Sequence, residues 1–200
     1  IGQGSPTNVM FGTGAKFPEK YQKALYAFDW SFGIIYAVSL TPSGATYSAT
    51  AEEFISGSPL PLTDGEIGPD GAMYFMTGGR RLESDLYRVY YAGDEDTEVS
   101  SASTEVPEAI QTRRKLEEFH TGGPKAGAVD FAWPYLKDED RFIQYAARVA
   151  LEHQPISEWK DKALAEKDPK IMTQAMIAMA RHADKSQQPQ MLQAMMGVDY

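Results

Sequence analysis

The sequence predicts the terminal blades of a β-propeller over residues 1–93, followed by an α-helical, HEAT-like solenoid over residues 107–200. Three observations lead to this prediction. Turn residues separate short apolar and aromatic runs in the first half, an aromatic pattern recurs within that half, and the apolar period becomes helical beyond residue 107. Residues 94–106 are acidic and rich in Ser and Thr, so we expect them to form a linker.

The first half is expected to be all β. Clusters of Gly, Pro, Ser and Asp recur at short intervals, and the runs between them are rich in Tyr, Phe, Val and Ile. Many short strands with this punctuation are typical of a sandwich, a barrel or a propeller. The predicted strand-bearing runs are KALYAFDW, GIIYAVSL, EEFISG, AMYFMTGG and DLYRVYY.

An internal repeat favours the propeller among these folds. The segment at 24–40 resembles the segment at 72–91: Tyr26 matches Tyr74 at a separation of 48, and Tyr36 matches Tyr87 at a separation of 51. This period suits one four-stranded blade. One or two blades cannot close a ring, so the sequence predicts an incomplete propeller whose earlier blades are missing.

The second half carries helical signals. Pro107 suits a first helical turn, and Asp168 followed by Pro169 predicts an N-cap with Pro at the first helical position. The segment at 136–151 aligns with the segment at 165–180 at an offset of 29. A short repeat of helical pairs is typical of an α-solenoid.

Composition narrows the possible partners. The formal net charge is -9, and the few basic pairs are isolated, which argues against nucleic acid. The chain has no Cys, which excludes disulfides, thiolate metal sites and covalent c-type haem within it. No apolar run reaches the length of about 18 residues expected of a membrane helix. The first residues have no signal-peptide pattern and no initiator Met, so we expect an internal fragment of a longer protein.

Two segments carry a resemblance to a known family. SPLPLTDGEIGPDGAMYFMTGGRRLESDLYRVYY followed by DRFIQYAARVALEHQP resembles large bacterial membrane-bound dehydrogenases typical of planctomycetes and verrucomicrobia. That family joins a glucose/sorbosone-dehydrogenase-like β-propeller to HEAT-like repeats and a C-terminal cytochrome c. The resemblance covers roughly residues 5–155 and implies a periplasmic or exported protein.

The resemblance also implies an activity. The chain would belong to an oxidoreductase that oxidises a sugar or alcohol with pyrroloquinoline quinone and passes electrons to a c-type haem domain, or another cytochrome-type acceptor, that lies outside it. Quinone-dependent relatives carry approximately Arg-Ile-Arg-Asp before the GPDG turn. This chain has Pro61, Leu62, Thr63 and Asp64 there, so the Asp is retained and both Arg are absent. Their absence argues against the quinone at this blade, because Arg side chains are the bidentate donors for its carboxylates.

Asp64 is therefore the candidate catalytic residue. If burial raised its pKa, Asp64 would act as a base toward a sugar hydroxyl. The alternative is that Asp64 bonds to a nearby backbone amide in a turn, as Asp residues often do.

Four further residues are candidates for binding substrate or cofactor. Asp29 and Trp30 end one predicted strand and would bind a sugar by hydrogen bonding and ring stacking, beside Thr77 or Gly78 of the next blade. Trp packing between blades, with Asp29 in a turn, is the alternative. Thr63 and Arg80 complete the set; a solvated loop is the alternative for Arg80. The three His match no zinc spacing, so we expect no metal site.

A second function competes with oxidation. The β part would bind a glycan or a protein without turnover, and the helical part would offer an interaction surface. The absence of the Arg pair favours this hypothesis.

Overall fold

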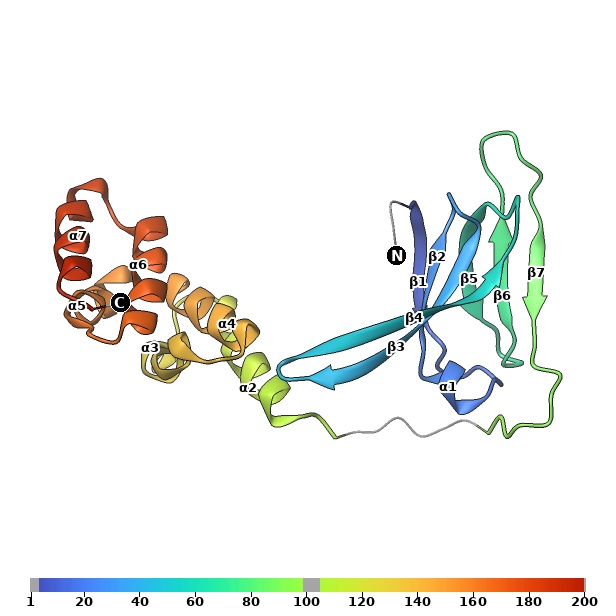
Figure 1. Ribbon diagram of the computed structural model, residues 1–200, viewed down its shortest axis with the longest axis horizontal. Helices are drawn as coiled ribbons and strands as arrows, with labels where there is room; N and C mark the ends of the chain where they lie inside the picture. Colours follow the sequence, from blue (N-terminus) through green and yellow to red (C-terminus); the bar gives the residue numbers. More distant parts are fainter. Residues whose placement is uncertain (1–3, 99–104, 200) are drawn as a thin grey trace. The chain divides into compact units, whose positions relative to one another are not determined.

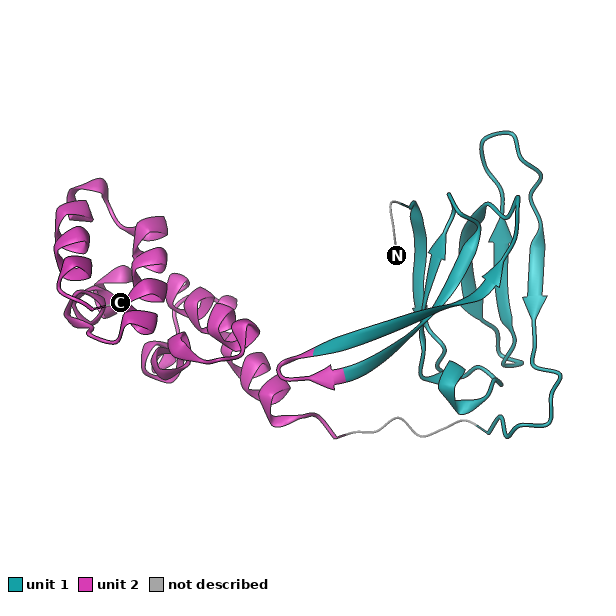
Figure 2. Cartoon of the chain, in the orientation of Figure 1, with its two compact units in different colours: residues 1–41, 47–104 teal, residues 42–46, 105–200 magenta. Residues whose placement is uncertain are grey.

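A computed structural model describes residues 4–98 and 105–199. The chain divides into two units (Figure 2). The first contains residues 1–41 and 47–104 and holds the β-sheets, and the second contains residues 42–46 and 105–200 and holds most of the helices. The predicted linker begins in the first unit as non-regular chain at 94–98, and its residues 99–104 lie outside the described part.

The first unit consists of two antiparallel sheets and one short helix (Figure 1). Each sheet is a meander in which consecutive strands pair. Short turns join most of these strands, and the longer connection between β1 and β2 contains the helix. The elements are β1 (Pro6–Phe11), α1 (Glu19–Gln22), β2 (Leu25–Asp29), β3 (Ile34–Ser43), β4 (Thr46–Ser56), β5 (Leu62–Ile67), β6 (Met73–Thr77) and β7 (Leu86–Val89). We call β1–β4 the first sheet and β5–β7 the second sheet.

The two sheets pack face to face on one apolar core. Alternation along each strand directs one set of side chains inward, and the buried residues of both sheets form a single cluster. Tyr26, Phe28 and Ile35 come from the first sheet, and Met73 and Phe75 come from the second. Phe54 of β4 adds its ring to the edge of this core, with its centroid 5.0 Å from that of Tyr26.

The second unit is built around helix α4 and the helices that follow it. Its core combines buried Ala and Met residues with the larger side chains of Leu136, Leu151 and Trp159. The helices are α2 (Glu108–Glu117), α3 (Ala128–Ala132), α4 (Arg141–Glu152), α5 (Ile156–Ala165), α6 (Pro169–His182) and α7 (Gln188–Met196), with 3-10 turns at Glu118–His120, Trp133–Lys137 and Lys185–Gln187.

The turn between β3 and β4 belongs to this second unit. Ala45 is fully buried in the helical core. Its N–H donates to Asp140 Oδ2 at 2.6 Å, and its carbonyl accepts from Arg113 Nη1 at 2.6 Å. Gly44 precedes it with φ of 58°, a left-handed conformation that Gly adopts without strain. A side chain at Gly44 would also collide with the Asp140 carboxylate.

The N-caps of α4 and α6 correct the predicted helical alignment by one residue. Asp140 accepts hydrogen bonds from the N–H groups of Phe142 and Ile143, and Asp168 accepts those of Lys170 and Ile171. The two caps are 28 residues apart, whereas the predicted offset was 29. The apolar pattern alone permits either offset, because a helix buries two adjacent rows of side chains. The predicted cap at Asp168 with Pro169 at the first helical position is confirmed.

The predicted propeller blades are wrong. The described residues form one four-stranded and one three-stranded antiparallel sheet, and no ring of blades is present among them. A meander that recurs every 48 to 51 residues fixes the strand order within each sheet. It does not require a ring, because two meanders also bury their apolar faces by packing on each other, as they do here.

The predicted HEAT-like solenoid is also wrong. A solenoid needs equivalent helical pairs, but α3 and α4 have 5 and 12 residues, whereas α5 and α6 have 10 and 14. Pro134 accounts for the short α3, because it lies in the 3-10 turn that directly follows this helix. The helices described here share one core in place of a regular array.

Candidate functional site

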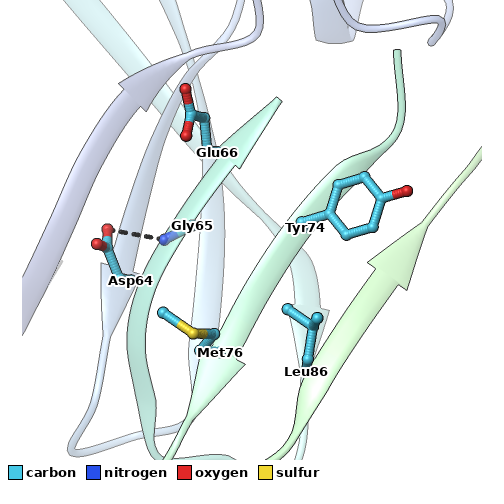
Figure 3. A pocket seen from close by; sticks show the side chains of 6 residues that line it. All are labelled: Asp64, Gly65, Glu66, Tyr74, Met76 and Leu86. Carbon is cyan, nitrogen blue, oxygen red and sulfur yellow. Dashed lines mark hydrogen bonds between the residues drawn. The ribbon is translucent and has the colours of Figure 1, made fainter. Parts of the chain in front are cut away.

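The outer face of the second sheet is the candidate functional site (Figure 3). The name refers to the exposed side of β5–β7, opposite the core. Cross-strand neighbours set its two rows: Asp64, Met76 and Leu86 in one, and Glu66, Tyr74 and Arg88 in the other. Leu86 is 68% exposed and Met76 is 48% exposed, so this face combines apolar side chains with charges in solvent.

A shallow hollow lies on this face. Its volume is about 340 Å³, and its lining residues come from all three strands of the sheet: Asp64, Gly65, Glu66, Tyr74, Met76 and Leu86. Figure 3 shows Asp64 and Glu66 along β5, with Met76 and Tyr74 on β6 and Leu86 on β7. The hollow is lined by two carboxylates and by no cationic side chain. An anionic quinone therefore does not fit it, because like charges repel.

Asp64 stands at a β-bulge. The pairing of β5 with β6 shifts between Leu62 and Asp64, and the Asp64 carboxylate accepts a hydrogen bond of 2.8 Å from the N–H of Gly65. The side chain is exposed. A base of raised pKa needs desolvation. The exposed carboxylate instead has the geometry expected of an Asp that bonds to its neighbouring backbone.

The hydrogen-bond register shows what Asp64 corresponds to in the first sheet. The pairing of β1 with β2 has the same bulge, between Pro6 and Asn8. After the bulge, Asn8 pairs with Phe28 as Asp64 pairs with Met76. The register of the next strand pair also matches, since Phe28 pairs with Ile35 as Met76 pairs with Leu86.

The two aromatic offsets seen in the sequence follow from this register. Tyr26 and Tyr74 stand at equivalent positions of β2 and β6, and Tyr36 and Tyr87 at equivalent positions of β3 and β7. The first strand of each sheet also belongs to the repeat, although the offsets of the Tyr residues do not include it. Its signal is PTNVMFG at 6–12 against LTDGEIG at 62–68, in which Thr, Asn or Asp, an apolar residue and Gly recur 56 residues apart.

In the first sheet, the residues equivalent to the outer-face positions bind the second sheet. Asn8 Nδ2 donates to the carbonyl of Gly65 at 2.7 Å, and Thr7 Oγ1 donates to the carbonyl of Leu62 at 2.9 Å. Phe28 packs so closely on Gly65 that a Cβ added there would lie 2.7 Å from a ring carbon. A β-sheet thus covers these positions in the first sheet, whereas their equivalents in the second sheet face solvent.

Arg88 is held by its neighbours on the outer face. Its guanidinium donates to Asp70 Oδ2 at 2.8 Å and to the Tyr74 hydroxyl at 3.0 Å. The hydrogen bond from Arg88, reinforced by the N–H of Ala72, lowers the pKa of Asp70 from its ordinary value to about 2. Arg88 also lies over the ring of Tyr90, 5.2 Å from its centroid.

Asp29 is a structural turn residue in this fold. It is buried, and its Oδ1 accepts hydrogen bonds from the N–H groups of Ser5, Ser31 and Phe32. A side chain at Gly4 would overlap its other carboxylate oxygen. The carboxylate is thus enclosed by the turn that it stabilises, and the alternative of a turn Asp describes its contacts.

Trp30 and Arg80 lie together, away from the outer face. Trp30 Nε1 donates to the carbonyl of Gly78 at 3.0 Å, and the Arg80 guanidinium carbon lies 5.0 Å from the centroid of the Trp30 ring. Arg80 and Arg81 have φ of 49° and 65°, which side-chain-bearing residues seldom adopt. A hollow of about 230 Å³ adjoins Trp30 and Leu82 and contains no charged side chain.

The structure therefore distributes the predicted site residues over separate places. Asp64 borders the outer face. The Thr63 hydroxyl donates to the carbonyl of Met76 at 3.0 Å, between β5 and β6. Asp29, Trp30 and Arg80 belong to the turns at the ends of the strands.

No protein-family model, curated protein or solved structure matches this chain. Across residues 4–98 and 105–199, no helix combines the length and hydropathy that crossing a membrane requires. The same residues contain no group of three or more His, Asp or Glu side chains placed to hold a metal ion.

Proposed function

We propose that this chain is a non-catalytic protein-binding module and that the outer face of the second sheet is its binding surface. One observation carries the proposal. The register equates the outer-face residues Tyr74, Met76 and Leu86 with Tyr26, Phe28 and Ile35 of the first sheet, whose side is covered by another β-sheet. A face of this design is suited to contact with protein backbone and side chains.

The composition of the outer face supports the same proposal. Tyr, Met and Arg are enriched at the centres of protein interfaces. Here Tyr74, Met76 and Arg88 lie together, with Leu86 and Tyr90 more than three-fifths exposed beside them. Contiguous exposed apolar groups with a polar rim are typical of interaction sites.

The edge of β7 adds unpaired backbone to this surface. β7 pairs only with β6 in the second sheet, so the other side of the strand is open in the described part of the chain. Leu86, Tyr87 and Tyr90 are exposed along this edge. Open strand edges are the places where proteins accept further strands.

Sugar or alcohol oxidation is the rival proposal. It rests on the hollow that Asp64 shares with Tyr74 and Glu66, with Asp64 as the base. It requires a desolvated carboxylate, whereas Asp64 is exposed and bonded to the N–H of Gly65.

Photo-cross-linking tests the binding proposal. A photoreactive amino acid replaces Leu86 of the outer face in the cells that make the protein, and Leu192 of α7, which is 53% exposed, in a matched control. We expect a protein adduct from position 86 that Met76→Glu removes, and none from position 192. Glycan adducts, or equal adducts from both positions, would contradict the proposal.

The substitution Asp64→Asn separates the two proposals. It removes the base that oxidation needs, so the rival predicts loss of dye reduction with sugars and alcohols. The binding proposal predicts an unchanged dye signal and a protein adduct at position 86 that is retained or increased, because an amide adds a hydrogen-bond donor.

A further inference from the structure

The first sheet also has an exposed apolar outer face. On the side opposite the core, alternation places Val9 and Phe11 of β1 beside Leu25 and Ala27 of β2 and Tyr36 of β3. Val9 is 58% exposed and Phe11 is 57% exposed. None of these five side chains carries a charge.

We infer that a second copy of this chain stacks the outer face of its first sheet on the outer face of the second sheet. The inference rests on the proposed function, because it names the partner of that same surface. The contact joins two different faces, so it is head-to-tail and lacks two-fold symmetry.

The interface inside the chain is the template for this contact. There, the side of the first sheet that carries Phe28 packs on the side of the second sheet that carries Gly65 and Phe75. By register, Met76 is the counterpart of Phe28, and Val9 is the counterpart of Gly65. The proposed contact therefore repeats the internal interface one step further along the stack.

The sizes of the paired residues change in a compensating way. Inside the chain the large ring of Phe28 faces Gly65, which has no side chain. In the proposed contact, the smaller Met76 faces Val9, which is larger than Gly. Met is flexible and fills irregular gaps, so it suits a surface that must fit a partner after folding.

Two polar contacts of the internal interface have counterparts in the proposed contact. The counterpart at Thr63 is favourable, and the counterpart at Asp64 is unfavourable. Thr63 is the counterpart of Thr7, whose hydroxyl donates to the Leu62 carbonyl. The Thr63 hydroxyl donates to the Met76 carbonyl within its own sheet and would turn from it to the Pro6 carbonyl of the second copy. Asp64 is the counterpart of Asn8, whose amide donates to the Gly65 carbonyl. An ionised Asp has no proton to donate, so it opposes a carbonyl at this position. Asp64 thus weakens the stack and keeps the association reversible.

Sedimentation velocity of the full chain tests the inference. The monomer has a mass of 22.1 kDa. We expect the mass to rise with concentration for the wild type and the association to be about tenfold tighter for Asp64→Asn, since one carboxylate–carbonyl clash becomes a hydrogen bond. A wild type that stays monomeric up to millimolar concentration, or an Asp64→Asn variant that associates more weakly, would overturn the inference.

Two complementary variants test the head-to-tail geometry. Val9→Glu damages only the first face, and Leu86→Glu damages only the second. Each variant is expected to be monomeric alone, and an equimolar mixture is expected to form 1:1 dimers that grow no further, because each pair retains one intact contact. A mixture that stays monomeric, or a Val9→Glu variant that associates like the wild type, would disprove the geometry.

Folding is checked by far-ultraviolet circular dichroism. If either variant unfolds, Phe11→Glu and Met76→Glu replace it, since both positions are about half exposed. The failure of this inference can be distinguished from the failure of the proposed function. A foreign-protein adduct at position 86 with a monomeric chain defeats this inference alone, whereas the absence of any protein adduct defeats both.

Discussion

Asn8 and Asp64 occupy the same position in two consecutive sheets, directly after the bulge in the first strand. Asn8 pairs with Phe28 and donates its amide to the Gly65 carbonyl, whereas Asp64 pairs with Met76 and accepts a hydrogen bond from the adjacent N–H of Gly65. The amide thus stands at the position that the second sheet covers, and the carboxylate stands at the equivalent position that faces solvent.

Replacing Asn8 with Asp should destabilise the β unit. The new carboxylate cannot donate to the Gly65 carbonyl, which loses its partner at a partly buried site. We expect a loss of about 1–3 kcal/mol in the free energy of unfolding, measured by urea denaturation. Asp64→Asn is the matched control and should change stability by less than about 0.5 kcal/mol, because Asp64 is exposed. Equal urea midpoints for Asn8→Asp and the wild type would refute the equivalence.

Gly65 is expected to tolerate no side chain. A Cβ there would lie 2.7 Å from the Phe28 ring, which is 1% exposed, so the ring would have to shift within the core. Gly65→Ala should lower the free energy of unfolding by about 1–3 kcal/mol through overpacking. Adding Phe28→Leu should recover part of that loss, since the two residues share one contact. Strict additivity of the two substitutions in thermal unfolding would contradict this packing.

Asp140 should contribute more than Asp168 to the free energy of unfolding, although both residues are N-caps. Both carboxylates accept the first N–H groups of their helices, but Asp140 also accepts the N–H of Ala45 at 2.6 Å. Asp168→Ala should cost about 1 kcal/mol, the usual loss of a cap. Asp140→Ala should cost about 2–4 kcal/mol, because a buried donor also loses its partner. Trp133 and Trp159 both lie in this unit, so fluorescence during denaturation in a Trp30→Phe background reports on its unfolding. Equal losses for both variants would speak against the Ala45 contact.

The lowered pKa of Asp70 predicts that the stability of the folded chain depends on pH in the acid range. Its pKa is lowered to about 2, first by the hydrogen bond from Arg88, so folding favours the ionised carboxylate. The stabilisation is complete above the unfolded pKa of about 4 and is lost as the pH falls through about 2. Melting temperatures of Asp70→Asn and the wild type should therefore differ at pH 6 and converge near pH 2. Carboxyl carbon NMR of Arg88→Gln should show the Asp70 pKa returning toward 4; an unmoved titration would rule out Arg88 as the cause.

The sequence was informative wherever a local rule determines the structure. Turn residues and aromatic runs predict β-strands, and Asp168 followed by Pro169 predicts a cap that the structure has. The spacing of Tyr26 from Tyr74, and of Tyr36 from Tyr87, agrees with the register of the two meanders. Each of these signals acts over a few residues or repeats within the chain.

The arrangement of whole elements was beyond those local rules. The same repeat suits a ring and a pair of packed sheets, since both bury one face of each meander on another. The place of Asp64 before the GPDG turn predicts a catalytic residue, but the exposure of a side chain is a tertiary property that no short motif encodes. The pairing of Asn8 with Gly65 joins residues 57 positions apart and could be recognised only by aligning β1 with β5.

Ala45 lies in the turn between β3 and β4, yet its side chain is part of the core of the helical unit. The core that contains Leu116, Ala146 and Met179 is completed by Ala45, which precedes α2, the first helix of this unit, by about sixty residues in the sequence. A polypeptide cut before Glu105 would leave the Asp140 carboxylate and the Arg113 guanidinium without their Ala45 partners. A cut in the sequence before Glu105 thus does not separate the two units, because residues 42–46 belong to the helical one. The helices form their complete core only when the turn between β3 and β4 is present.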